Sequence, residues 1–324
     1  MMWVSGRAIL CLAAAVVLGL AGNAMAAFPD KPIRLVIPYA GGGMGSVFGT
    51  TVSERLAARL SSPVYAEYKP GANGAIGTEI VARSPADGHT LLMVTTSTLT
   101  INPALYPKLS YDPLKDFTPV AMVLISRNVL YTYPEKASTL KDLIQLAASK
   151  PEGLSFGSLG IGTLGHLTGE MLRRQANINA IHIPFKGQGQ VMTEVAAGRL
   201  DFAFGDPSGL QMAASGRVRA LAVTGPQRIA SAPNVPTLSE LGFPGVGTLS
   251  WVGIVAPAGT PKNVVDRISA ELKKAFDEDA VKAKMSSLGQ DIASDMSPAY
   301  FDREIRGELE RWKRFQADAR ISVE

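Results

Sequence analysis

The sequence predicts an α/β protein that is divided into two lobes with largely parallel sheets. Short apolar runs rich in β-branched residues alternate with helical patterns through most of the chain, which is typical of strands and helices packed in layers. The chain has 324 residues, a length that favours two domains over one. If the last helical pattern packs on the first lobe, the chain must cross between the lobes twice. Two crossings would form a hinge beside a cleft.

Residues 1–26 have the layout of a Sec signal peptide. Arg7 supplies a positive charge, residues 8–20 are apolar, and Ala26 ends a cleavage site of the A-x-A type. The apolar part is too short to span a bilayer, which takes about 20 apolar residues. We therefore expect export to the periplasm and release as a soluble protein. The single cysteine, Cys11, lies in this leader, so the mature protein would form no disulfide and offer no thiolate ligand.

The first lobe is predicted to comprise residues 27–124 and 247–324. One helix should follow the first strand with Ser46 as its N-cap. In the C-terminal part, Thr260 and Ser297 each precede a proline, a pattern that marks helix starts. The last helix carries one apolar stripe of Phe301, Ile305, Leu309, Trp312 and Phe315. Strands are expected at residues 33–37, 64–67, 90–94 and 249–255, with a further helix near residues 75–83.

The second lobe is predicted over residues 125–246. Helical patterns separate its strands, and the Pro/Gly-rich residues 231–247 have the composition of turns. Its strands are expected at residues 129–132, 154–157, 180–183, 201–204 and 220–223.

A glycine-rich loop over residues 38–46 joins the first strand to the next helix. At such a junction, free backbone N–H groups and the helix dipole favour an anion, and open α/β sheets bind ligands at this edge. The alternative is an ordinary flexible turn, but four glycines within residues 41–45 favour a ligand loop. The candidate contacts here are Tyr39, Ala40, Gly42, Gly43 and Ser46.

Three further loops follow strands and combine small residues with hydroxyl or amide side chains. Such groups can hydrogen-bond to a carboxylate without a buried counter-charge. Each loop could also be ordinary surface, so their recurrence at equivalent strand ends is the stronger indication. The candidates are Asn73, Thr96, Ser97, Ser158, Gly162 and Thr163. Lys186 could attract an anion or be a solvated surface lysine, and Asp206 could contact a ligand or cap the next helix.

Enzymatic and nucleic-acid functions find little support in the sequence. Ser155 fits the G-x-S-x-G pattern, but it falls inside a predicted strand, and Glu170 is the only acid between it and His182. A serine hydrolase therefore remains a weak alternative. The histidines lack metal-site spacing, and no G-x-G-x-x-G motif indicates a dinucleotide. We expect no metal and no cofactor. A net charge of +4 without a basic, aromatic-rich run argues against nucleic acid.

Segments spread along nearly the whole mature chain carry a family resemblance. They comprise the glycine-rich loop and residues 28–33, 69–72, 87–92, 102–106, 116–120, 162–167, 184–187, 219–224 and 256–261. With these segments the sequence resembles the Bug-type receptors, which are the substrate-binding components of tripartite tricarboxylate transporters.

That resemblance implies a Venus-flytrap fold of type II with two hinge crossings, closing on a small carboxylate. The ligand would be a dicarboxylate, a tricarboxylate, an aromatic acid or an amino acid. Carried over to this chain, the family pattern implies ligand contacts at Tyr39, Ala40, Gly42, Gly43, Thr96 and Ser97 from one lobe, and at Ser158, Gly162, Thr163 and Asp206 from the other. It also implies a monomer that serves two membrane subunits; an orphan receptor that signals to a sensor kinase is the alternative.

The glycine-rich loop departs from the family pattern at four positions. Gly41 stands where the family has proline, Met44 replaces the third glycine, Gly45 the hydroxyl residue and Ser46 the aspartate. The missing carboxylate removes a fixed acceptor, and Met44 adds a side chain where the backbone should approach the ligand. We therefore expect a ligand that differs from the common ones of the family.

Overall fold

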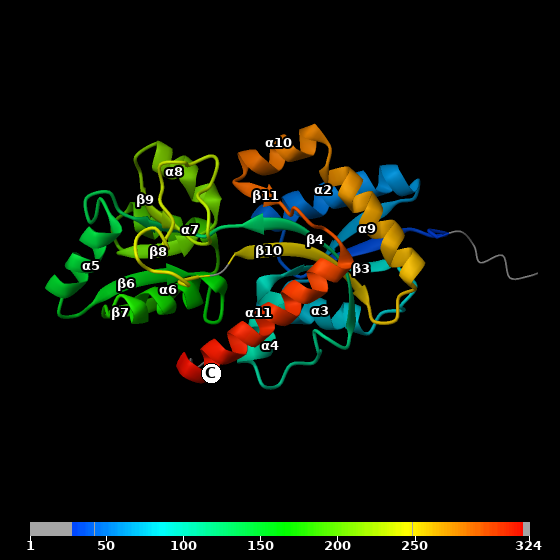
Figure 1. The fold of residues 1–324 in the computed structure, drawn as a ribbon, viewed down its shortest axis with the longest axis horizontal. Coiled ribbons are helices and arrows are strands. Elements are labelled where there is room, and N and C mark those ends of the chain that lie inside the picture. Colours follow the sequence, from blue (N-terminus) through cyan, green and yellow to red (C-terminus); the bar gives the residue numbers. More distant parts are fainter. Residues whose placement is uncertain (1–27, 42, 248, 320–324) are drawn as a thin grey trace, which may run out of the picture.

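The chain forms two lobes, each built on its own mixed sheet, as the computed structural model shows (Figure 1). The structure describes residues 28–41, 43–247 and 249–319. The predicted signal peptide with Cys11, and Gly42 of the glycine-rich loop, lie outside these residues. Among the helices in these ranges, none combines the length and apolarity needed to cross a membrane.

Lobe 1 contains a six-stranded sheet in the order β11-β4-β10-β3-β1-β2. Every large aliphatic side chain of β1 is fully buried, because helices cover both faces of the sheet (Figure 1). The strands are β1 (Ile33–Ile37), β2 (Val64–Tyr68), β3 (Thr90–Thr95), β4 (Phe117–Ser126), β10 (Ser250–Pro257) and β11 (Gln290–Ile292). The helices are α2 (Gly43–Leu60), α3 (Ala75–Ala82), α4 (Asn102–Leu105), α9 (Lys262–Phe276), α10 (Asp279–Ser287) and α11 (Pro298–Ala319), with short turns η1 (Ala72–Gly74) and η2 (Ser97–Ile101).

Lobe 2 contains a five-stranded sheet in the order β7-β6-β8-β5-β9. Its core gathers around the stacked rings of Phe156 and Phe202, whose centroids lie 5.2 Å apart. The strands are β5 (Val129–Thr132), β6 (Leu154–Ser158), β7 (Ala180–Pro184), β8 (Phe202–Gly205) and β9 (Arg219–Val223). The helices are α5 (Leu140–Ser149), α6 (Leu164–Gln175), α7 (Gln188–Ala196) and α8 (Leu210–Ala214), with the short turn η3 (Pro207–Gly209).

Each sheet contains one strand that directly follows a crossing of the chain from the other lobe. In lobe 1 this strand is β10, which runs antiparallel to both β3 and β4. In lobe 2 it is β5, which runs antiparallel to both β8 and β9. The prediction of largely parallel sheets was therefore wrong: only β1, β2 and β3, and β6, β7 and β8, pair in parallel. The arriving strands enter from the opposite end and force antiparallel pairing.

The two connections between the lobes run side by side. Ser126 at the end of β4 pairs with Ser250 at the start of β10. Just beyond, Asn128 and Thr224 exchange two hydrogen bonds: the Thr224 N–H donates to the Asn128 carbonyl at 2.8 Å, and the Asn128 N–H donates to Thr224 Oγ1 at 2.9 Å. The predicted two-lobed fold with two hinge crossings is confirmed. The lobe boundaries at residues 124 and 247 stay a prediction.

Some local expectations differ from the structure. Helix α2 begins at Gly43, so Ser46 lies inside its first turn and is not the N-cap. Helix α9 begins at Lys262, and the Thr260 hydroxyl donates to the Pro257 carbonyl instead of capping the helix. Ser297 does cap α11, since its Oγ accepts from the Tyr300 N–H at 3.2 Å. The long strand β4, the edge strand β11 and helix α10 were not predicted from the sequence.

Helix α11 packs on lobe 1 and also reaches lobe 2. Its side chains Phe301 and Ile305 are buried in the lobe 1 core, as the apolar stripe predicts. Further along, Trp312 joins a buried cluster with Leu105 of lobe 1 and with Leu164 and Leu167 of lobe 2. The end of α11 therefore contacts both lobes (Figure 1).

A buried carboxyl group on α11 faces the crossing strand β10. Glu308 is 4% exposed and accepts a hydrogen bond from Trp251 Nε1 at 2.9 Å. Burial raises the pKa of Glu308 to about 7, against the opposing effects of that hydrogen bond and of Arg311. Because the pKa is raised, the folded state favours the protonated carboxyl group.

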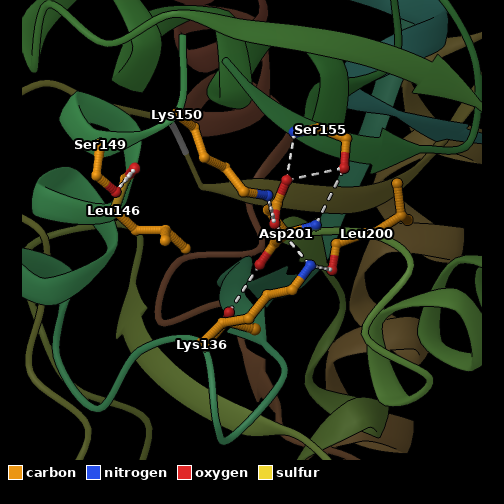
Figure 2. A network of polar contacts seen from close by, with 8 residues as sticks. Lys136, Leu146, Ser149, Lys150, Ser155, Leu200 and Asp201 are labelled. Carbon is orange, nitrogen blue, oxygen red and sulfur yellow. Dashed lines mark hydrogen bonds and ion pairs between the residues drawn. The ribbon is translucent and has the colours of Figure 1, made fainter. Parts of the chain in front are cut away.

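A buried carboxylate organises the amino end of the lobe 2 sheet, as Figure 2 shows. Asp201 is 3% exposed; its Oδ1 accepts from Lys136 Nζ at 2.6 Å and Lys150 Nζ at 2.9 Å. Its Oδ2 accepts from the Ser155 N–H at 2.8 Å and from Ser155 Oγ at 3.1 Å. Burial alone would raise the pKa of Asp201, but the hydrogen bonds from Lys136, Ser155 and Lys150 outweigh it and lower the pKa.

We predict that Glu308→Gln stabilises the protein at pH 8 but not at pH 5. A glutamate in the unfolded chain titrates near pH 4.3. The stabilising contribution of Glu308 to the free energy of unfolding is therefore fully present below that pH and is lost as the pH rises through about 7. The neutral glutamine should raise the free energy of unfolding by roughly 2 kcal/mol at pH 8. Urea unfolding at both pH values measures this. Glu310→Gln, on the exposed side of α11, is the control, and a gain at pH 5 as large as that at pH 8 would contradict the assignment.

We predict that Asp201→Asn lowers the free energy of unfolding by about 2–4 kcal/mol at pH 7, because it leaves two lysines facing a neutral group in a buried site. Asp266→Asn, in an exposed pair with Lys262, should cost less than about 1 kcal/mol. In the wild type, the contribution of ionised Asp201 to the free energy of unfolding should be lost as the pH falls below about 3.9 and through the lowered pKa of Asp201. Urea unfolding measures both variants. If they lower the free energy of unfolding equally, the buried network around Asp201 stabilises the fold no more than an exposed ion pair does.

Candidate ligand-binding site

A cleft of about 410 Å³ lies between the lobes, at the carboxyl ends of the parallel strands. Both lobes and both crossing segments contribute to its walls. In open α/β sheets, ligands bind at this end of the strands. The lining residues are Tyr39, Gly45, Asn73, Met93, Thr95, Ser97, Ser250, Val252 and Gln290 with Ser126 and Asn128 at the crossing, and Leu159, Thr163, Leu164, Gly165, Lys186, Gln188, Phe204, Gly205 and Asp206 from lobe 2.

Three helices begin at this cleft. Gly45 lies in the first turn of α2, Gly165 in the first turn of α6, and Gln188 is the first residue of α7. The first turn of a helix has N–H groups without intrahelical acceptors and the positive end of the helix dipole. None of these three first turns carries an acidic residue. The cleft therefore receives partial positive charge from both lobes, an arrangement that suits an anion.

On the lobe 1 wall, the polar side chains are held in place by their neighbours. The Tyr39 hydroxyl lies 2.6 Å from Thr95 Oγ1, and burial raises the pKa of Tyr39 to about 12, which keeps the phenol protonated as a possible donor. Asn73 has a positive φ of 49° and exchanges hydrogen bonds with Asn102: its Nδ2 donates to Asn102 Oδ1 at 2.9 Å, and its carbonyl accepts from Asn102 Nδ2 at 3.0 Å. This wall is therefore preorganised.

The lobe 2 wall has a free amide donor. The Nε2 of Gln188 is buried and has no hydrogen-bond partner among the described residues. It packs closely against Gly205: a Cβ atom at position 205 would lie only 2.0 Å from the Gln188 Nε2 atom. A buried amide without a partner is costly, and a ligand acceptor in the cleft would relieve that cost. Gln188 was not proposed from the sequence, although it lies two residues after Lys186 in the motif that was singled out.

The charged residues of the cleft are few. Among the described lining residues, Lys186 is the one cation and Asp206 the one anion. Asp206 caps the turn that follows β8, because its Oδ1 accepts from the Ser208 N–H at 2.8 Å. Asp206 thus has the capping role that the sequence left open, and it also lines the cleft.

Six of the residues predicted as ligand contacts line this cleft: Tyr39, Asn73, Ser97, Thr163, Lys186 and Asp206. Six others are not among its lining residues: Ala40, Gly43, Ser46, Thr96, Ser158 and Gly162. Gly42, and the side chain of Met44 that distinguishes the loop, lie outside the described part of the structure. The polar groups at the hinge, Ser126, Asn128, Ser250 and Gln290, were missed because their meeting depends on the pairing of β4 with β10 and β11.

Two of the residues that do not line the cleft have clear structural partners. Thr96 is 1% exposed and its Oγ1 accepts from the Trp251 N–H at 3.1 Å, which ties β3 to the crossing strand. Ser158 is 1% exposed, and its Oγ lies 2.7 Å from His182 Nε2. These hydroxyl groups support the cleft from behind.

A pair of histidines supports the loop between β6 and α6. The rings of His166 and His182 lie 4.1 Å apart, centroid to centroid. His182 contacts Ser158 at the start of this loop, and His166 Nδ1 accepts from the Gly162 N–H at 3.2 Å. Burial, followed by the neighbouring His166, lowers the pKa of His182 to about 4. Both rings are neutral at pH 7, since burial lowers the pKa of His166 as well.

The serine of the G-x-S-x-G pattern lies away from the cleft. Ser155 hydrogen-bonds to Asp201 at the amino end of β6 (Figure 2), whereas the cleft lies at the carboxyl end. In the described ranges, no group of three or more His, Cys, Asp or Glu side chains could hold a metal ion.

Comparison with known sequences gives one family and several relatives. The model of the tripartite tricarboxylate transporter family receptor matches residues 49–319. A protein encoded in the tcbD-tcbE intergenic region of Pseudomonas sp. (strain P51) is 34% identical over 302 residues, covering 92% of this chain and 89% of that protein. Protein BugT of Bordetella pertussis is 32% identical over 292 residues, covering 88% of each chain.

Solved structures agree with this grouping. A protein of R. palustris solved with adipate superimposes with a TM-score of 0.83 at 28% identity, covering 91% of this chain and 99% of that one. MatC from Rhodopseudomonas palustris, with bound malate, superimposes with a TM-score of 0.79 at 28% identity, covering 89% of this chain and 99% of MatC.

We predict that the protein loses stability as the pH falls from about 6.5 to about 4, and that His182→Gln reduces this loss. An unfolded histidine titrates near pH 6.5 and His182 in the fold near pH 4, so the unfolded state binds more protons in this window. Glutamine keeps a polar group for Ser158 but does not titrate. Urea unfolding at pH 7 and pH 4.5 gives the comparison; an identical pH dependence in wild type and variant would exclude His182 as a contributor.

Proposed function

The chain belongs to the tripartite tricarboxylate transporter family of receptors, and we propose that it binds a small organic carboxylate between its two lobes. The convergence of three helix starts on one cleft carries this proposal. Two of them, α6 and α7, belong to lobe 2, while α2 belongs to lobe 1. A carboxylate between them would receive hydrogen bonds from both lobes and would complement both sets of helix dipoles.

Neutral donors would supply most of the remaining recognition. Tyr39, Gln188, Ser97 and Ser250, which carry hydroxyl or amide groups, line the same cleft. A neutral donor to a carboxylate forms a charge-assisted hydrogen bond without the desolvation cost of a buried cation. Lys186 is exposed, so its role would be to attract the anion and not to hold it in a buried ion pair.

Binding would close the cleft about the two crossing segments. The side-by-side strands β4 and β10, paired at Ser126 and Ser250, form a short, defined hinge. A ligand that contacts both lobes stabilises the closed arrangement by its extra contacts there. The related structures solved with adipate and with malate support a carboxylate as the ligand.

We further propose that residues 1–26 direct export to the periplasm and that the mature chain acts there as a monomer. It would capture its ligand without a chemical step and pass it to two membrane subunits.

We predict that Gln188→Glu weakens carboxylate binding at least tenfold while the fold is retained. The substitution places a negative charge in the cleft and removes an amide donor, and loss of a hydrogen bond to a charged group costs about 1.5–3 kcal/mol. A carboxylate at the start of α7 favours the helix dipole, so misfolding would not explain the loss. Thermal shift and calorimetry with dicarboxylates, tricarboxylates and aromatic acids measure it.

The matched control is Gln211→Glu, the same change in the same lobe, at an exposed residue of α8 that does not line the cleft. It should bind as the wild type does. If both variants lose binding equally, general electrostatics and not the cleft would account for the effect. A wild-type protein that no carboxylate stabilises would overturn the proposed function.

A further inference from the structure

A second chamber of about 570 Å³ opens directly beside the cleft. We call it the outer chamber. It too lies between the lobes, with Ile76, Tyr106 and Leu109 on the lobe 1 side and Leu159 and Ile161 on the lobe 2 side. Asn73, Leu159 and Thr163 line both spaces. The outer chamber is therefore continuous with the wall of the ligand cleft.

The outer chamber combines exposed apolar side chains with the polar residues Asn73, Glu79, Lys108, Ser110 and Thr163. Ile76 is 49% exposed, Leu159 48% and Ile161 42%. These are three of the eight large hydrophobic residues that are exposed in the described part of the chain. Scattered apolar residues on a surface need no explanation, but a group from two lobes around one hollow indicates a binding surface.

The loop between β6 and α6 serves both spaces. Its residue Thr163 and the helix start at Leu164 and Gly165 line the cleft, while Ile161 lines the outer chamber. Gly162, at a φ of 76°, lies between them and packs against Leu105 and Tyr106 of lobe 1. One short loop thus lines both spaces, and its residues Leu159 and Thr163 take part in each.

We propose that the outer chamber holds an apolar body of the ligand whose carboxylate the cleft binds. The inference rests on the proposed function and narrows it to amphipathic carboxylates, with an aliphatic chain or an aromatic ring, in preference to compact acids such as malonate. Ile76 contacts this body from one lobe, and Leu159 and Ile161 contact it from the other. Because the body touches both lobes, its burial favours the closed state along with the carboxylate.

A series of acids tests this directly. The purified protein is titrated by calorimetry with malonate, butyrate, hexanoate, octanoate and 3-phenylpropionate. Affinity should rise by about fourfold for each added methylene until the chamber is filled, which is the gain expected from burying one such group. Tighter binding of octanoate indicates a chain, and tighter binding of 3-phenylpropionate indicates a ring; either result supports the proposal.

Variants locate the effect. Ile161→Ser and Ile76→Ser, one in each lobe and both outside the cleft lining, should weaken the longest well-bound acid at least tenfold and change malonate binding less than twofold. Leu241→Ser is the matched control, since Leu241 is 37% exposed and lines neither space. It should leave every affinity unchanged.

Two outcomes overturn the inference, and they are distinguishable. If malonate binds and affinity does not rise along the series, or the two variants behave as the control does, the outer chamber takes no part and the proposed function still stands. If none of the acids binds, the proposed function fails as well.

Discussion

The exchange of strands between the lobes is the constraint on which the rest of the structure depends. Strand β10 enters the lobe 1 sheet and strand β5 enters the lobe 2 sheet, each antiparallel to its neighbours. The chain connections therefore lie together, joined by Ser126–Ser250 pairing. This arrangement turns the carboxyl ends of both sets of parallel strands toward one gap. Helix starts that would otherwise point to unrelated surfaces then meet at one cleft.

Charge in the cleft follows from this geometry. Helix dipoles and neutral donors come from both lobes, while cations are almost absent from the lining. A site of this kind binds an anion by groups that are already oriented by secondary structure, so little side-chain ordering opposes binding. The buried supports behind it are Thr96, which is hydrogen-bonded to Trp251 of β10, and the His166–His182 pair under the lobe 2 loop; they hold the walls in place. The outer chamber adds an apolar surface at the edge of the same gap.

Much of this could be predicted from the sequence because the local signals are strong. Periodicity placed β1 and β5 at their observed bounds, and the ordered motifs indicated the family that the family model confirms. Long-range pairing was less accessible. The sheets were expected to be largely parallel because no local signal marks a strand as arriving from another lobe. For the same reason Asn128, Ser250 and Gln290 were missed as cleft residues. The contact of Ser158 with His182, which joins two strands, was likewise not readable from local sequence.

The central claim is that main-chain N–H groups from both lobes hold one carboxylate. Amide chemical shifts, followed by NMR as a carboxylate is titrated into the protein, test it most directly. The account predicts that Gly45 of lobe 1 and Gly165 and Gln188 of lobe 2 shift together and with one dissociation constant. Shifts confined to a single lobe, or shifts at surface lysines with these three amides unchanged, would contradict it.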